Sequence, residues 1–337
     1  MSDDQAAEPP GQANPGEPTA PDPSEGLARK VVVATVAGGL VFAALALYSD
    51  AGKLAETATT FSLSAFALGL LLATINYGLR IARWQFYLQH LGIHVPLAQS
   101  SLIFLSGFVM SVTPGKVGEV FKSLLLYEAR GTPIARTAPI VVAERLTDLI
   151  ALVLLTALGS LAFPQGPVLA AAGGVIVGLL LLVCAYRPLG ELLLRVAGRL
   201  PLLRRITDRL HVAYESLHEM TRPAPLLIGS AIAVLAWGLE CVSMYVIVHG
   251  FAGVTMDWDA TTFAYAASQV MGAVAMMPGG LGVTEVGMTG LLQTLGDGHV
   301  SAPVATATTI LVRLATLWWA VVIGALALAV HRMRQRG

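Results

Sequence analysis

The stretch 261–295, TTFAYAASQVMGAVAMMPGGLGVTEVGMTGLLQTL, decides the fold. It is apolar on both sides of Met277-Pro278-Gly279-Gly280, where proline removes a hydrogen-bond donor and glycine frees the backbone to turn. The stretch 98–127 is broken in the same way at Thr113-Pro114-Gly115. Because a regular helix cannot run through either break, we expect each stretch to form a helical hairpin whose two ends lie on the same side.

Long apolar runs flank these hairpins, and each is long enough to cross about 30 Å of hydrocarbon at about 1.5 Å per residue. The runs are 31–48, 61–80, 137–160, 168–186, 226–250 and 303–330. Of the 337 residues, 55% are hydrophobic and 12% are charged, whereas about 25% are charged in an average soluble domain. The sequence therefore predicts an all-α polytopic membrane protein with six full spans and two re-entrant hairpins. It excludes cytosolic enzymes, nucleic-acid binders and secreted disulfide scaffolds.

The N-terminal segment 1–28 has a different composition from the rest of the chain. It is rich in proline and acidic residues and contains no aromatic residue. Such a segment cannot bury enough apolar surface to offset the entropy lost on ordering. We expect a disordered tail over 1–28, followed by a membrane domain over 29–337.

The positive charges predict the topology, because cytoplasmic loops are enriched in arginine and lysine. If each hairpin returns to its own side, one set of flanks collects Arg29, Lys30, Arg80, Arg83, Arg130, Arg136, the seven arginines of 187–223, and Arg332, Arg334 and Arg336. The opposite flanks hold Lys53 with the acids Asp50, Glu56, Asp257, Asp259 and Asp297. We therefore expect both termini in the cytoplasm and the protein in the bacterial inner membrane.

The loop 187–223 has a helical period of its own. Its apolar residues at this period are Leu203, Ile206, Leu210, Ala213, Tyr214, Leu217 and Met220. This pattern is typical of a helix in the inner interface, where its arginines would contact anionic lipids. A cytoplasmic helix packed on the membrane domain explains the pattern equally well.

Two parts of the chain resemble each other. The similar segments are Pro114-Gly115-Lys116-Val117-Gly118-Glu119 and Pro278-Gly279-Gly280-Leu281-Gly282 with Glu285, and then Arg145-Leu146-Thr147-Asp148-Leu149 and Arg313-Leu314-Ala315-Thr316-Leu317. They define a repeat over 61–160 and 226–330. Because three full spans separate the two starts, the second copy is inverted. Inverted repeats with broken helices are the architecture of alternating-access transporters.

Charged residues inside the apolar runs are the candidate site, because an ionised side chain at bilayer depth is costly unless it is paired or hydrated. They are Lys116, Glu119, Lys122, Glu144, Arg145, Asp148, Glu240, Glu285 and Arg313. Glu144 and Asp148 share one helix face beside Arg145, and Glu119 is the matching partner for Arg145. Arg313 has no acid within four residues, so we expect its partner to be Glu285 or Glu240.

These charges have two interpretations. They form salt bridges that fix helix packing, or they line a cavity where Arg145 and Arg313 bind a phosphate by paired hydrogen bonds. Backbone N–H groups at the half-helix starts would add affinity for an anion. We expect no metal and no cofactor, because Cys184 and Cys241 lie in apolar runs without CxxC spacing.

Three motifs carry a family resemblance: TPGKVGEVFKSLLL at 113–126, AERLTDLIAL at 143–152 and MPGGLGVTEVGMTGLL at 277–292. Together they resemble the lysylphosphatidylglycerol synthase transmembrane family, which includes the flippase region of the bacterial multiple peptide resistance factor. The resemblance covers roughly 30–330 and implies a membrane domain that moves lipid headgroups through a cavity between the repeats. Its polar motif residues correspond to Glu119, Arg145, Asp148, Glu285 and Arg313. The chain ends soon after the last span, so we expect no synthase domain.

The leading functional hypothesis is a lipid translocase for a phospholipid or another phosphate-bearing lipid, rather than an enzyme. Its partners would be a membrane lipid with an anionic headgroup and, through 187–223, inner-leaflet lipids, but not a nucleic acid. The alternatives are a membrane transferase that uses a lipid-linked donor and a non-transporting partner of another membrane protein. The sequence leaves a homo-oligomer open.

Overall fold

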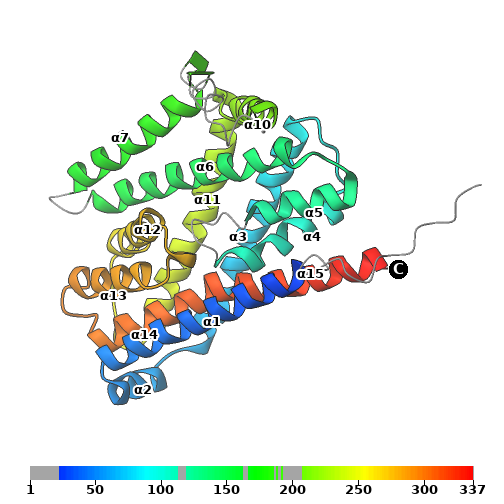
Figure 1. Ribbon diagram of the computed structural model, residues 1–337. Coiled ribbons are helices and arrows are strands. Elements are labelled where there is room, and N and C mark those ends of the chain that lie inside the picture. Colours follow the sequence, from blue (N-terminus) through cyan, green and yellow to red (C-terminus); the bar gives the residue numbers. More distant parts are fainter. Residues whose placement is uncertain are drawn as a thin grey trace, which may run out of the picture.

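A computed structural model describes residues 23–112, 119–161, 166–185, 187–188, 191–192 and 207–336. Within these residues the regular secondary structure is helical, and one isolated bridge joins Phe61 to Phe251. Figure 1 shows long helices that cross and pack against one another. The prediction of an all-α fold is confirmed for the described part of the chain.

The first half of the chain contains seven of the described α-helices. They are α1 (Pro23–Tyr48), α2 (Ala51–Thr59), α3 (Leu63–His90), α4 (Leu97–Ser106) with the 3-10 turn η1 (Gly107–Met110), α5 (Phe121–Arg130), α6 (Ile134–Ser160) and α7 (Gly166–Ala185). Helix α1 begins inside the segment 1–28 that we expected to be disordered, whereas residues 1–22 lie outside the described residues. Helices α1 and α2 are bent by 94° at the break between them.

The second half of the chain again alternates helices with short 3-10 or π-helical segments. It consists of α10 (Thr207–Met220), α11 (Pro223–Val248), α12 (Trp258–Val274), the 3-10 turn η3 (Pro278–Gly280), α13 (Val283–Leu295), α14 (Ala302–Arg313), the π-helical segment η4 (Leu314–Trp318) and α15 (Trp319–Arg336). The last three elements form one long rod in Figure 1, and α1 packs against α14.

Three described helices are long and apolar enough to cross a membrane. They are Leu63–His90, Pro223–Val248 and Ala302–Gln335, and the bent pair α1–α2 would make a fourth. The expected spans 137–160 and 168–186 are helical, as α6 and α7. Because α6 contains Glu144, Arg145 and Asp148 among its apolar residues, composition alone does not mark it as a span. The number of six spans stays a prediction.

Helix α3 is longer than the predicted span 61–80, and this corrects one expectation. It continues to His90, so Arg80 and Arg83 lie inside it and their side chains are buried. Trp84 and Tyr87 follow them and are fully buried in the same helix. Because this aromatic turn is packed in the core, the helix does not end at Arg80. Both arginines therefore lie within α3 and not beyond its end, whereas their place on the cytoplasmic side stays a prediction.

The predicted break at 277–280 is confirmed. Helix α12 ends at Val274, and the backbone then takes positive φ at Met276, Gly279, Gly280 and Gly282 before α13 begins. Glycine adopts such angles without steric cost, which explains three of these four positions. Helices α12 and α13 pack against each other as a hairpin (Figure 1). The other predicted break, with Pro114, Gly115, Lys116 and Gly118, lies outside the described residues.

The two halves pack against each other reciprocally. Helix α3 packs along α11, α12 of the second half packs on α6, and α4 with η1 packs on α15. A glycine allows a close backbone approach at each of the last two contacts. A Cβ on Gly159 of α6 would lie 2.6 Å from the Phe263 nitrogen of α12, and one on Gly324 of α15 would lie 2.6 Å from the Val109 nitrogen of η1.

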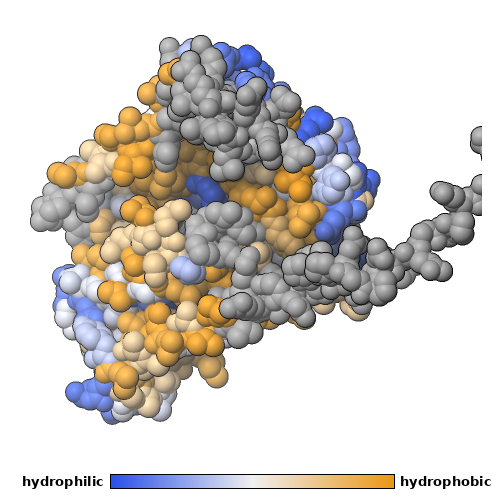
Figure 2. All heavy atoms as spheres, in the orientation of Figure 1, coloured by the Kyte–Doolittle hydropathy of each residue, from blue (hydrophilic) through white to orange (hydrophobic). Residues whose placement is uncertain are grey.

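Polar residues gather at two edges of the molecule. Figure 2 shows a mainly apolar face with hydrophilic residues over α2 and over α10, and a hollow between them. At the α2 edge, the Ser62 amide donates to the Gly250 carbonyl at 2.8 Å, and α2 packs on α14. Away from the α2 edge, Arg136 of α6 donates from Nη2 to the Leu91 carbonyl, directly after α3, at 2.6 Å.

Helix α10 packs on α6. The half-buried residues of its predicted apolar face are Leu210, Ala213, Tyr214 and Leu217. Met220 at its end is fully buried in a core cluster with residues of α3, α4 and α6. Leu203 and Ile206 lie outside the described residues. This contact fits both interpretations of the loop 187–223, because an interfacial helix also packs on the domain that it borders.

Candidate functional site

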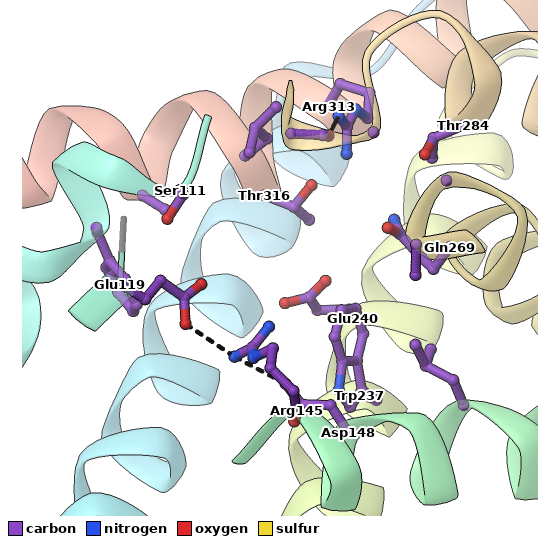
Figure 3. A pocket seen from close by; sticks show the side chains of 18 of the residues that line it. Ser111, Glu119, Arg145, Asp148, Trp237, Glu240, Gln269, Thr284, Arg313 and Thr316 are labelled. Atoms are coloured by element: carbon purple, nitrogen blue, oxygen red, sulfur yellow. Dashed lines mark hydrogen bonds and ion pairs between the residues drawn. The ribbon is translucent and has the colours of Figure 1, made fainter. Parts of the chain in front are cut away.

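A cavity of about 320 Å³ lies between the two halves of the chain. Its walls come from α3, α6, α11, α12, the break before α13 and the α14–α15 rod. The charged residues that line it are Arg80, Glu119, Arg145, Asp148, Glu240 and Arg313. Figure 3 shows that these walls carry their polar groups toward a shared interior. Five of the predicted candidate residues therefore meet in one place.

Arg145 is the most accessible cation of this cavity, since 27% of its side chain is exposed, whereas 10% of the Arg80 side chain and 4% of the Arg313 side chain are exposed. Its Nη2 lies 3.2 Å from Glu119 Oε2 and 2.9 Å from Asp148 Oδ2. The predicted pair of Arg145 with Glu119 is confirmed. Figure 3 shows the guanidinium reaching into the middle of the cavity.

Arg313 is held by the break that precedes α13. Its Nε donates to Glu285 Oε1 at 2.5 Å, and its Nη2 donates to the Gly279 carbonyl at 2.6 Å. The other carboxylate oxygen of Glu285 accepts from the Gly282 amide at 2.6 Å. Of the two partners predicted for Arg313, the structure selects Glu285, and this pair ties α14 to both ends of the break.

Directly after Arg313 the helix widens into the π-helical segment η4. Such segments are rare and frequently lie at functional sites. Here η4 brings Thr316 and Leu317 to the cavity, and the Thr316 carbonyl accepts from the Tyr77 hydroxyl at 3.1 Å. This bond links the second half of the chain to α3.

Glu240 lies in the middle of α11 and is not the partner of Arg313. Its carboxylate accepts hydrogen bonds from Asn76 of α3 and from the hydroxyl of Tyr265 of α12. Arg80 Nη2 lies 3.5 Å from Glu240 Oε1. Helices α3 and α12 therefore both contact one buried carboxylate of α11, which places polar contacts inside the packed helix pair α3–α11.

Asp148 is contacted by three arginines. Arg83 Nη1 lies 2.8 Å from its Oδ1, and Arg145 Nη2 and Arg80 Nη1 lie 2.9 and 3.8 Å from its Oδ2. Arg80 also lies over the ring of Trp237 at 4.7 Å from the centroid. The side chain of Asp148 is 6% exposed, so it neutralises part of this positive charge where water is scarce.

Glu144 does not join this cluster, although it lies one turn before Asp148. It pairs with the buried Lys122 of α5, whose ammonium lies 4.5 Å from the Trp84 ring centroid and 4.7 Å from that of Phe104. Both residues line a much smaller cavity of about 10 Å³ beside the main one. A one-turn offset on α6 therefore directs the two acids to different cations.

The remaining predicted site residues divide into two groups. Gly279 and Gly280 line the main cavity, Glu285 lies behind Arg313, and Pro278 and Gly282 belong to the break. Lys116 lies outside the described residues, as does the break around Pro114. In the described part of the chain, no three His, Cys, Asp or Glu side chains are placed to hold a metal ion.

Sequence reasoning missed Arg80, Arg83 and Asn76. All three belong to α3, beyond or near the end of the predicted span. The signal that could have found them is the apolar and aromatic turn that follows, at Trp84, Tyr87 and Leu88. An arginine with an apolar helix on both sides is a candidate for an intramembrane charge.

Fold and site together define an all-helical integral membrane protein with a charged cavity between two reciprocally packed halves. The model of the family described as "Lysylphosphatidylglycerol synthase TM region" matches residues 31–324. The chain belongs to this family, as its motifs predicted, and this membership points to a lipid-related function in the membrane.

One similar curated protein is a "UPF0104 membrane protein" of Methanothermobacter thermautotrophicus. It is 27% identical over 96 residues, which cover 28% of this chain and 27% of the relative. The similarity therefore spans about a quarter of each protein and is consistent with a membrane protein.

Proposed function

We propose that the protein is a lipid translocase that takes a phosphate-bearing headgroup into the cavity while the acyl chains stay in the bilayer. The observation that carries this proposal is the chemistry of the cavity and its rim. The interior is charged, whereas Met276 and Met277 line the cavity and are also 63% and 47% exposed at the apolar surface. A ligand that fits both regions has a polar end and an apolar end.

The size of the cavity supports a headgroup rather than a whole lipid. Its volume of about 320 Å³ lies at the lower limit of ligand pockets, which are about 300–1,000 Å³. Flexible methionine side chains adapt to varied apolar partners. The rim at Met276 and Met277 is therefore suited to acyl chains that remain outside.

Arg145 is the group that we assign to the headgroup phosphate. It is always charged, it has the largest exposed fraction of the cavity arginines, and its fork of donors matches phosphate oxygens. Arg313 already donates to Glu285 and Gly279. Its part in the proposal is to hold the second break, and this modifies the expectation that both arginines bind phosphate.

We also propose that the two halves are inverted repeats and that the headgroup moves between two sides of the membrane. The reciprocal packing of α12 on α6 and of α4 on α15 supports a two-fold relation, and so do the close contacts at Gly159 and Gly324. This topology places both termini in the cytoplasm and the arginines of 187–223 at the anionic inner leaflet.

Cysteine labelling tests this topology in a chain whose Cys184 and Cys241 are replaced by alanine. His299→Cys and Val212→Cys are suitable reporters, because both native residues are exposed. We expect an impermeant maleimide to label His299→Cys in intact cells. The same reagent should label Val212→Cys only after the cells are permeabilised. Labelling of Val212→Cys in intact cells would contradict the inverted-repeat topology.

Photo-crosslinking tests the location of the headgroup. A photoreactive amino acid replaces Leu317, which lines the cavity, or Leu326, which is 60% exposed on the same long rod. We expect the probe at Leu317 to capture phosphate-bearing lipids in excess of their share of the membrane, and the probe at Leu326 to capture the bulk mixture. Identical lipid profiles at both positions would rule out a selective headgroup site in this cavity.

A further inference from the structure

Two cavities share a wall in the middle of the protein. The main cavity and the smaller cavity of about 10 Å³ are both lined by Arg80, Phe108, Glu119 and Arg145. Lys122 and Glu144 line the smaller cavity alone, whereas Arg313 lines the main cavity alone. Arg80 and Arg145 therefore stand in the wall between the two cavities, whereas Arg313 lies away from it.

The guanidinium of Arg80 is held at one edge and loosely bound at the other. Its Nε donates to Asn76 Oδ1 at 2.9 Å. Its two terminal nitrogens lie 3.8 Å from Asp148 and 3.5 Å from Glu240, which is longer than a normal hydrogen bond between such groups. The Asn76 bond thus orients a fork of donors that a phosphate could engage more closely.

Arg80 and Arg145 are also near each other, because both approach Asp148 Oδ2, at 3.8 and 2.9 Å. Two guanidinium groups beside one carboxylate oxygen can share a tetrahedral anion, since each presents planar, directional donors. Arg313 differs, because its Nε and Nη2 are already bonded at 2.5 and 2.6 Å.

We propose that Arg80 is the second phosphate ligand of the site and binds the headgroup together with Arg145, at the wall between the two cavities. This inference rests on the proposed function and narrows it to a phosphate held by two arginines of the first half of the chain. Arg313 is then a positioning residue for the break before α13. Asn76 is a positioning residue for Arg80.

The test measures how short-chain phosphatidate stabilises the purified, detergent-solubilised full chain against heat, with short-chain diacylglycerol as the phosphate-free comparison. A ligand that binds the folded state raises the melting temperature in a concentration-dependent way, which yields its affinity. The variants are Arg80→Lys, Arg145→Lys, Arg313→Lys and Asn76→Ala. The matched control is Arg130→Lys, because Arg130 is exposed and bonds to Gln99 on the surface.

We expect phosphatidate, but not diacylglycerol, to stabilise the wild type. Arg80→Lys and Arg145→Lys should each weaken phosphatidate binding at least about tenfold through loss of the bidentate fork. Asn76→Ala should weaken phosphatidate binding less, because it removes no charge. If Arg80→Lys folds poorly, the Asn76→Ala variant still tests the role of Arg80. Arg313→Lys should lower the melting temperature measured without ligand, while its phosphatidate affinity should change less than that of Arg80→Lys or Arg145→Lys. Arg130→Lys should change neither the melting temperature nor the affinity.

Two outcomes would overturn the inference in different ways. If Arg80→Lys and Asn76→Ala bind phosphatidate as the wild type does while Arg145→Lys does not, Arg80 is not a ligand, but the proposed function stands. If phosphatidate and diacylglycerol stabilise the wild type equally, the site does not recognise phosphate, and both the inference and the phosphate specificity of the proposed function are wrong.

Discussion

Replacing Arg145 by glutamine is expected to abolish lipid transport while the protein stays folded. The change removes the most accessible cation of the cavity, and loss of one partner of such a charged contact costs about 2–5 kcal/mol of interaction. Arg145→Lys keeps the charge and loses the bidentate fork, so its transport rate should fall between those of the wild type and Arg145→Gln.

The fold should tolerate these changes because Asp148, a buried acidic partner of Arg145, keeps other cations. Asp148 still faces Arg83 at 2.8 Å and Arg80 at 3.8 Å. The measurement compares the transport of labelled lipid by reconstituted variants with their monodispersity in detergent, and Arg130→Gln is the surface control. Transport at the wild-type rate by a well-folded Arg145→Gln protein would remove Arg145 from the site.

Replacing Arg313 by glutamine is expected to destabilise the protein strongly. The change leaves the fully buried Glu285 without its cation and removes a donor from the Gly279 carbonyl. Breaking a buried ion pair by removal of one partner costs about 3–5 kcal/mol. The expected result is a lower melting temperature and poor monodispersity in detergent.

A second substitution separates charge from packing in this prediction. In the double variant Arg313→Gln with Glu285→Gln, no buried carboxylate is left uncompensated. We therefore expect the double variant to melt above the Arg313→Gln single variant, as coupling between contacting residues predicts. A single variant that melts like the wild type would show that the pair does not hold the break before α13.

The parts of the fold that could be predicted follow from local physical limits. Pro278 and the glycines after it prevent a continuous helix, and the structure ends α12 before them. A buried arginine needs an acid, and this limited the predicted partner of Arg313 to Glu285 or Glu240, of which the structure shows Glu285. The same reasoning paired Arg145 with Glu119.

The missed features depend on tertiary packing. Arg80 reads as the end of a span, since hydropathy falls there, and it is buried because α11 supplies Glu240 and Trp237 as partners. Glu144 is bound by Lys122, which is 22 residues away and belongs to another helix. Sequence spacing shows which residues share a face of one helix, but it does not show which face meets a neighbour.

The widening of the helix at η4 was also hidden in the sequence. Residues 303–330 read as one regular apolar span, whereas the structure inserts a π-helical segment at Leu314–Trp318. This segment presents Thr316 to Tyr77 and the cavity. A periodicity argument assumes a uniform helix and therefore cannot locate such a segment.

Reconstitution of the wild-type protein alone tests the central claim most directly. Purified full chain is placed in vesicles of phosphatidylethanolamine and phosphatidylglycerol that carry fluorescent phosphatidylglycerol, and an impermeant quencher reports the label that reaches the outer leaflet. We predict that the inner-leaflet label becomes accessible faster than in protein-free vesicles, and that Arg145→Gln abolishes this gain. Equal rates with folded wild-type protein and with no protein would contradict lipid translocation by this chain.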